Sequence, residues 1–168
     1  MDDAPHNIVM IETTPVCTYL ITFTCYGTWL HGDPRGSVDK EHNVPGTEFL
    51  PQDEERLRRA RAMLAQEPVL LNEKQRQVVD ATIREVCNYK QWTLLAINVR
   101  SNHVHTVVIA NATPESVMNC FKRYASRHLH EQHLFYKTAT IWTRHGSTRY
   151  LNDQRSIDNA VRYVLEGQ

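Results

Sequence analysis

The sequence predicts a single α+β domain with a ferredoxin-like antiparallel sheet and helices packed on it. The 168 residues are 41% hydrophobic and 23% charged, as expected for one soluble globular domain. Along the chain, segments typical of strands and helices follow in the order strand, helices, strand, strand, helix, strand, helix. We assign residues 1–15 to a flexible N-terminal tail and residues 16–168 to the domain.

The first half of the chain predicts a strand, a long loop and two helices. Residues 16–27 are rich in β-branched and aromatic residues, which favour a strand. Residues 28–51 contain three of the six glycines and three of the seven prolines, which is typical of an irregular loop. Asp53 can cap a short, highly charged helix, and Asn72 can cap a second helix over residues 73–90.

The middle of the chain predicts a hairpin followed by a helix. Residues 91–99 and 103–110 are apolar runs separated by the short segment RSN, which is typical of antiparallel strands joined by a turn. Thr113 and Pro114 suit the N-cap and first position of a helix that extends to about His130.

Charge and localisation signals restrict the class of protein. The 19 basic and 19 acidic residues give a net charge of zero, which argues against non-specific coating of nucleic acid but permits a local basic groove. No run approaches the roughly 20 apolar residues that span a bilayer. The N-terminus starts acidic and lacks the pattern of a signal peptide, so we expect a cytoplasmic protein with no membrane partner. The four cysteines form no C-x-x-C pair, and we expect reduced thiols.

Two histidines open the second strand of the predicted hairpin, in the segment SNHVHTVVI. Side chains alternate along a strand, so His103 and His105 should stand on the same face. Imidazole is the commonest neutral metal ligand, and such a pair can hold a divalent ion with other positions open. A chance pair with local hydrogen bonds is the ordinary alternative, so a metal site requires support from elsewhere in the chain.

The last strand and helix contribute a second notable side chain. Residues 138–151 predict a strand with a bend at Gly146, and Ser156 can start a helix that Gly167 ends. Tyr163 lies about 140° from the centre of the apolar stripe of that helix. It can reach the histidines if the helix crosses the edge of the site or docks on a second subunit, which makes a homodimer possible. The stripe consists of Ile157, Ala160, Val161, Val164 and Leu165.

A tyrosine beside a metal held by two histidines suits nucleophilic attack on a phosphodiester. The ordered set NHVH, KRYASRHL, IWTRHGSTRYL and RYVLEGQ resembles the single-tyrosine HUH transposases, particularly the REP-associated tyrosine transposases. The resemblance covers the chain from about Tyr19 to its end. It implies the HUH transposase fold, in which His103 and His105 bind Mg²⁺ or Mn²⁺ and Tyr163 becomes linked to the 5′ end of single-stranded DNA.

The resemblance also implies a third metal ligand, an amide four residues after the tyrosine. That position is Gly167 in this chain, and the neighbouring candidates are Gln168, which we assign as the ligand, and Glu166. Tyr150 is the rival nucleophile, although a packed tyrosine is ordinary in a strand. Trp29 and Trp142 can stack on unpaired bases or pack in the core. Six basic side chains are candidates for DNA contacts. Three lie on the polar side of the predicted helix: Lys122, Arg123 and Arg127. The other three could instead be solvated charges or members of surface ion pairs: Arg144, Arg149 and Arg162.

These observations favour an enzyme that cleaves and rejoins single-stranded DNA, at ends marked by a hairpin. A few unpaired bases and the shape of a hairpin can supply recognition that bulk charge does not. One alternative is a domesticated descendant that binds DNA or RNA hairpins without cutting them. The other is a metal-dependent hydrolase of small phosphoesters, which would need more carboxylate ligands near the histidines than the sequence offers.

Overall fold

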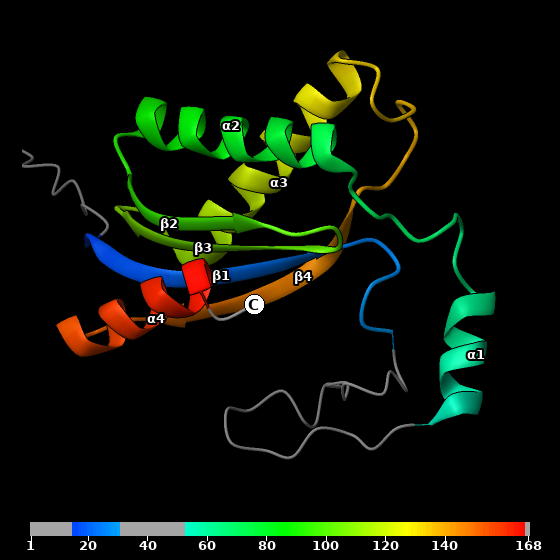
Figure 1. Ribbon diagram of the computed structural model, residues 1–168, viewed down its shortest axis with the longest axis horizontal. Coiled ribbons are helices and arrows are strands. Elements are labelled where there is room, and N and C mark those ends of the chain that lie inside the picture. Colours follow the sequence, from blue (N-terminus) through cyan, green and yellow to red (C-terminus); the bar gives the residue numbers. More distant parts are fainter. Residues whose placement is uncertain (1–14, 31–52, 167–168) are drawn as a thin grey trace, which may run out of the picture.

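The computed structural model describes residues 15–30 and 53–166 (Figure 1). Four predictions fall wholly or mostly outside the described residues: the tail except for its last residue, most of the loop at 28–51, the helix end at Gly167 and the ligand Gln168. The described part confirms the predicted α+β class, because one antiparallel sheet carries helices on both of its faces.

The sheet has four strands, β1 (Cys17–Cys25), β2 (Thr93–Val99), β3 (His103–Ala110) and β4 (Trp142–Tyr150). Their order is β2-β3-β1-β4, and every neighbouring pair is antiparallel. The predicted hairpin is therefore confirmed as β2 and β3, while β1 from the start of the chain pairs with β3 and with β4. This order brings residues from distant parts of the sequence onto one sheet surface.

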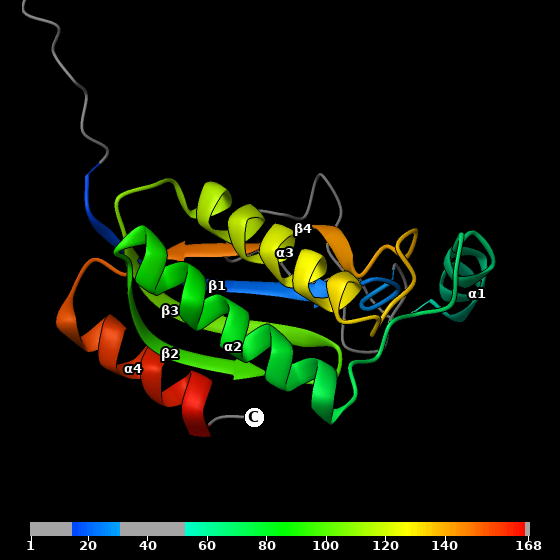
Figure 2. The same cartoon turned by 90° about the horizontal axis from the view of Figure 1, so that it is seen from above.

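Four helices accompany the sheet: α1 (Glu54–Ala62), α2 (Glu73–Lys90), α3 (Pro114–Glu131) and α4 (Gln154–Glu166). Helices α2 and α3 cover one face, and α4 lies on the opposite face (Figures 1 and 2). Helix α1 projects away from the sheet in both views and buries none of its residues. No helix among residues 15–30 and 53–166 is long and apolar enough to cross a membrane.

Side-chain caps fix the starts of these helices. Asn72 and Gln75 form a capping box at the start of α2, and Thr113 caps α3, as predicted. The predicted start of the last helix at Ser156 is wrong, because Asp153 is the capping residue. Its carboxylate accepts from the Ser156 amide at 2.9 Å, and these bonds hold the pKa of Asp153 below its usual range.

The alternation of β3 divides its side chains between two cores. Val104 and Val108 join the large core under α2 and α3, together with apolar residues of β1 and β4. On the opposite face a smaller core lies beneath α4. Because His105 alternates with Val104, it shares the α4 face with this second core. The smaller core consists of Ala96, Val107, Leu151, Ala160 and Val164.

Gly146 of β4 provides a test of how closely α3 packs on the sheet. A Cβ atom at this position would lie 2.5 Å from the Met118 sulfur and 2.5 Å from the backbone oxygen of Thr22. The methionine can move, but the strand backbone cannot, so Gly146→Ala is expected to lower the free energy of unfolding by about 1 to 3 kcal/mol. Urea denaturation measures this, with exposed Ser147→Ala as the control, and equal stability of both variants would contradict the packing described here.

Candidate active site

The two histidines stand side by side on the α4 face of the sheet. Their ring centroids are 4.6 Å apart and the ring planes meet at 74°. In the register with β1, His103 is opposite Thr24 and His105 is opposite Thr22. The prediction that both rings occupy one face of a strand is therefore confirmed.

Each imidazole is oriented by a hydrogen bond to its Nδ1 atom. The Asn102 Oδ1 lies 2.7 Å from His103 Nδ1, and the Thr22 Oγ1 lies 2.7 Å from His105 Nδ1. An amide oxygen only accepts, so His103 carries a proton on Nδ1 in this pairing, and the lone pair of its neutral ring is on Nε2. The Thr22 hydroxyl can match either tautomer of His105. Such partners fix the ring orientation of metal-binding histidines.

The two rings differ in exposure. His103 is half-buried, whereas only 4% of His105 is exposed. The strand period predicts that the two rings share a face, but it does not predict this difference in exposure. The cause is tertiary packing, because α4 lies over β2 and β3 at this position and Tyr163 of that helix contacts the ring.

Tyr163 lies against the histidine pair of its own chain. Its ring centroid is 5.4 Å from that of His105, with the ring planes at 73°, and 44% of the residue is exposed. The predicted apolar stripe of α4 is confirmed for four of its five residues, because Ala160 and Val164 are buried and Ile157 and Val161 pack against the same small core. The fifth residue, Leu165, does not pack, and Tyr163 is not opposite the packed face. The buried face is centred on Ala160 and Val164, whereas Leu165 is 59% exposed, so Tyr163 flanks the packed face at about 100° from Val164. No second subunit is needed to bring the tyrosine to the histidines.

Asn98 of β2 ties the end of α4 to the sheet beside the histidines. Its amide nitrogen donates to the backbone oxygen of Val164 at 2.8 Å, and the residue is opposite His105 in the register. This bond fixes the helix turn that carries Tyr163. The sequence gives no direct sign of the contact, because it depends on how α4 docks.

Trp29 occupies the other side of the pair. Its ring stacks on His103 with a centroid distance of 5.7 Å and an interplanar angle of 23°. Its backbone is left-handed, with φ of 52°. Trp142, in contrast, is a core residue, because it is buried, packs edge-on against Phe23 and donates its indole N–H to the backbone oxygen of Lys122. Core packing is thus the correct alternative for Trp142.

The rival nucleophile Tyr150 lies elsewhere. It is paired with Tyr19 in the sheet, and the two rings pack edge-on with centroids 5.0 Å apart. Tyr19 belongs to the core under α2 and α3, so this pair lies on the sheet face opposite the histidines. The geometry therefore favours Tyr163 over Tyr150 as the tyrosine of the site.

The candidate DNA contacts are divided between the two faces. Arg149 is opposite Leu20, which packs against the small core, so it shares the face of the histidines. Arg162 is exposed on α4 next to Tyr163, and Arg144 is exposed near the start of β4. These three arginines remain candidates for phosphate contacts.

Arg123 and Arg127 belong to α3, on the opposite side of the sheet. Both guanidinium groups stack on the Tyr124 ring, at 5.2 and 5.5 Å, and Arg127 pairs with Glu131 at 3.2 Å. The structure does not bring these two residues to the histidine pair.

The prediction that Lys122 contacts DNA is wrong. Only 8% of the residue is exposed, and its ammonium donates to the backbone oxygens of Thr143 and His145 at 2.9 and 3.0 Å. Burial lowers its pKa to about 8, so the ammonium remains the main form at neutral pH. The helix pattern places Lys122 on the polar side of α3, but β4 packs close to that side and buries the residue.

Lys122 should instead stabilise the fold. Lys122→Met keeps the side-chain volume but removes the bonds to the β4 backbone, so we expect a loss of about 1 to 3 kcal/mol in the free energy of unfolding. Arg123→Gln, one residue along the same helix but exposed, should change it by no more than about 0.5 kcal/mol. Thermal unfolding of both variants measures this difference. A larger loss of stability in Arg123→Gln would contradict the assignment.

The histidine pair fits a divalent cation. Two imidazoles with oriented rings supply two nitrogen ligands and leave positions for water or phosphate oxygens. Among residues 15–30 and 53–166, no group of three histidine, cysteine, aspartate or glutamate side chains could hold a metal ion. The described residues thus offer two candidate ligands, and the predicted third ligand Gln168 lies outside the described residues.

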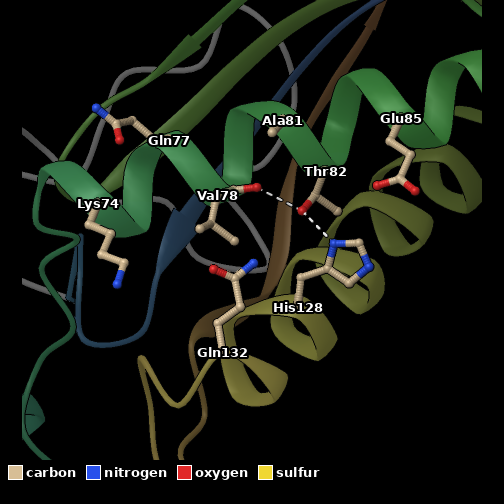
Figure 3. Close-up of a pocket in the computed structure, with 8 residues that line it drawn as sticks. All are labelled: Lys74, Gln77, Val78, Ala81, Thr82, Glu85, His128 and Gln132. Carbon is tan, nitrogen blue, oxygen red and sulfur yellow. Dashed lines mark hydrogen bonds between the residues drawn. The ribbon is translucent and has the colours of Figure 1, made fainter.

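A groove between α2 and α3 is separate from the histidine pair (Figure 3). It has a volume of about 470 Å³ and lies on the helical layer, across the sheet from the histidine pair. Within it the Thr82 hydroxyl donates to the Val78 backbone oxygen and lies 2.9 Å from His128 Nδ1. The contact of Thr82 with His128 joins the two helices, and no tyrosine or cysteine lines the groove.

Comparisons with known proteins agree with this geometry. The family model described as "Transposase IS200 like" matches residues 63–166, more than half of the chain. A REP-associated tyrosine transposase bound to a REP hairpin has the same fold, with a TM-score of 0.52 and 11% identity over 98% of this chain and 70% of that one. A protein from Deinococcus radiodurans R1 that is assigned as a transposase gives a TM-score of 0.50 and 11% identity over 95% and 98%. A search of curated proteins finds no match.

Proposed function

The chain belongs to the IS200-like transposase family, and from this premise we propose that it is a metal-dependent endonuclease and strand transferase for single-stranded DNA, with Tyr163 as the nucleophile. The observation that carries the proposal is the contact of the Tyr163 ring with His105, whose neighbour is His103. A nucleophile and two metal-binding side chains thereby meet on one sheet face. They come from α4 and β3, which are far apart in the sequence.

The chemistry follows from the groups in contact. The Tyr163 oxygen attacks the phosphorus of a phosphodiester, the bond from phosphorus to the 3′ oxygen breaks, and the preceding nucleotide leaves with a 3′ hydroxyl. The protein then holds a 5′-phosphotyrosine, and attack by another 3′ hydroxyl rejoins the strand and releases the tyrosine. Mg²⁺ or Mn²⁺ held by His103 and His105 would supply Lewis-acid polarisation of a non-bridging phosphate oxygen.

The rest of the chain has roles in positioning. Thr22 and Asn102 orient the imidazoles, and Asn98 fixes the α4 turn that carries the tyrosine. Arg149 can hold a phosphate of the strand, because it is exposed and shares the sheet face of the histidines, and Arg162 is a second candidate because it is exposed on the helix that carries Tyr163. These local charges give a basic contact despite the neutral chain.

Hairpin-marked ends are the proposed substrate. The support is the solved transposase of similar fold that is bound to a REP hairpin, together with the neutral charge, which favours recognition of shape and unpaired bases over bulk attraction. Cleavage in cis is proposed because His103, His105 and Tyr163 are in contact within one chain. A homodimer is compatible with this but is not required for it.

The test is formation of a covalent adduct. The full chain is incubated with Mn²⁺ and labelled single-stranded oligonucleotides that carry a hairpin and unpaired flanks, and the products are separated on a denaturing gel. We expect label that migrates with the protein and a free 3′ hydroxyl fragment. Tight binding of the hairpin without any adduct, in either Mg²⁺ or Mn²⁺, would instead identify a binding protein that does not cleave.

A further inference from the structure

Four aromatic rings form a continuous series across the candidate site. Trp29 stacks on His103, His103 packs against His105, and His105 packs against Tyr163, with centroid separations of 5.7, 4.6 and 5.4 Å. Trp29 and Tyr163 therefore lie at opposite ends of the histidine pair. The proposed chemistry gives the Tyr163 end a role and leaves the Trp29 end without one.

The backbone at Trp29 is costly to maintain. A φ of 52° is left-handed, which is unfavourable for a bulky side chain and costs about 1 to 3 kcal/mol at such positions. The residue is also 41% exposed, although most tryptophans are largely buried. The chain thus holds a large flat ring against a histidine of the site and exposes part of it to solvent.

The geometry of phosphoryl transfer indicates which nucleotide would lie near the Trp29 ring. In an in-line displacement at phosphorus, the attacking oxygen and the leaving oxygen are on opposite sides. If the phosphate lies at the histidine pair and Tyr163 attacks from one end, the 3′ oxygen departs toward the other end. The nucleotide that carries this leaving oxygen then lies on the Trp29 side.

We propose that Trp29 is the stacking platform for the base of the nucleotide immediately 5′ of the cleaved bond. This inference rests on the proposed function and adds a base-binding subsite to it. The ligand is an unpaired nucleobase, and stacking on an indole accepts any base because each has a π face. By stacking this base, the protein keeps the 3′ hydroxyl close to the site after cleavage, where it is available for rejoining.

The experiment measures whether loss of the base and loss of the ring are coupled. Tyr163→Phe is used as the background, so that the strand binds and stays intact, with an oligonucleotide whose cleavage position has been mapped by adduct formation with the unmodified protein. An abasic nucleotide on the 5′ side of that position should weaken binding about 5- to 150-fold, which corresponds to about 1 to 3 kcal/mol of stacking at 1.4 kcal/mol per tenfold. Adding Trp29→Ala should weaken binding of the intact strand similarly.

Combining the abasic nucleotide with Trp29→Ala tests whether the base and the ring interact. In the protein that also carries Trp29→Ala, the abasic nucleotide should weaken binding by less than about twofold, because the stacking interaction is already lost. Trp29→Phe keeps a ring, so the abasic nucleotide should still weaken binding to this variant nearly as much as to the protein with Trp29. An abasic nucleotide on the 3′ side of the cut should weaken binding by the same factor with or without Trp29. An equal 5′-side abasic penalty in both proteins, or no penalty in either, would overturn the inference. Absence of an adduct with the unmodified protein would instead refute the proposed function.

Discussion

Replacing His103 or His105 with alanine is expected to reduce DNA cleavage below detection in both Mg²⁺ and Mn²⁺. Each variant removes one of the two imidazole nitrogens that the described residues offer to the cation. Lewis-acid stabilisation of a phosphoryl transition state is worth several kcal/mol, so its loss corresponds to at least about a hundredfold in rate. Single-turnover cleavage of a labelled hairpin oligonucleotide measures this, and Mn²⁺ binding by electron paramagnetic resonance measures the ligand loss directly.

The two variants should differ in stability, and this separates folding from chemistry. His103 is half-buried, so His103→Ala should unfold close to the temperature of the unmodified protein. His105 is buried and bonded to Thr22, so His105→Ala should lose about 1 to 3 kcal/mol. His130→Ala on α3, across the sheet, is the matched control and should cleave normally. Cleavage by His103→Ala at the unmodified rate would refute the metal assignment.

Much of the fold could be predicted from local signals in the sequence. The β2–β3 hairpin follows from two apolar runs around a three-residue turn, and Asn72 and Thr113 mark helix starts because their side chains can bond the first free amides. Ser156 was misleading because Asp153, three residues earlier, offers a stronger acceptor to the same turn. The β2-β3-β1-β4 order itself depends on long-range pairing, which no local pattern encodes.

The candidate site was only partly predictable for the same reason. The strand period places His103 and His105 on one face, since that depends on neighbouring residues alone. The bond from Thr22 to His105 requires the register of β1 with β3. The burial of Lys122 requires β4 to approach α3, which makes three backbone oxygens available to a side chain that the helix pattern places among polar residues.

The rotation of α4 shows how an apolar stripe can mislead. Counting Leu165 with the packed residues moves the centre of the stripe away from Tyr163. In the structure Ala160 and Val164 are buried against β2 and β3, Ile157 and Val161 pack partly buried against the same core, and Leu165 is exposed. The tyrosine consequently flanks the interface and reaches His105 of its own chain.

Tyr163→Phe is expected to eliminate the covalent adduct while folding, Mn²⁺ binding and hairpin binding remain unchanged. The substitution removes only the phenolic oxygen, which is the proposed nucleophile. The ring remains, and it is the ring that contacts His105. The denaturing-gel assay measures the adduct, and a gel-shift assay with the same hairpin measures binding. Tyr150→Phe is the matched control, because its ring packs on Tyr19 on the other face, and it should form the adduct normally. An adduct that persists in Tyr163→Phe but disappears in Tyr150→Phe would transfer the role to Tyr150.

A mixture of two inactive variants then distinguishes action within one chain from exchange between two. Tyr163→Phe retains the histidine pair, and His103→Ala retains the tyrosine. If each tyrosine serves the histidines of its own chain, as the contact of Tyr163 with His105 favours, the mixture should form no adduct. If two subunits exchange α4, one composite site would contain both an intact pair and a tyrosine, and activity would return in the mixture. Recovery of the adduct would therefore show that α4 exchanges between two subunits during the reaction, and that the contact within one chain is not the reacting arrangement.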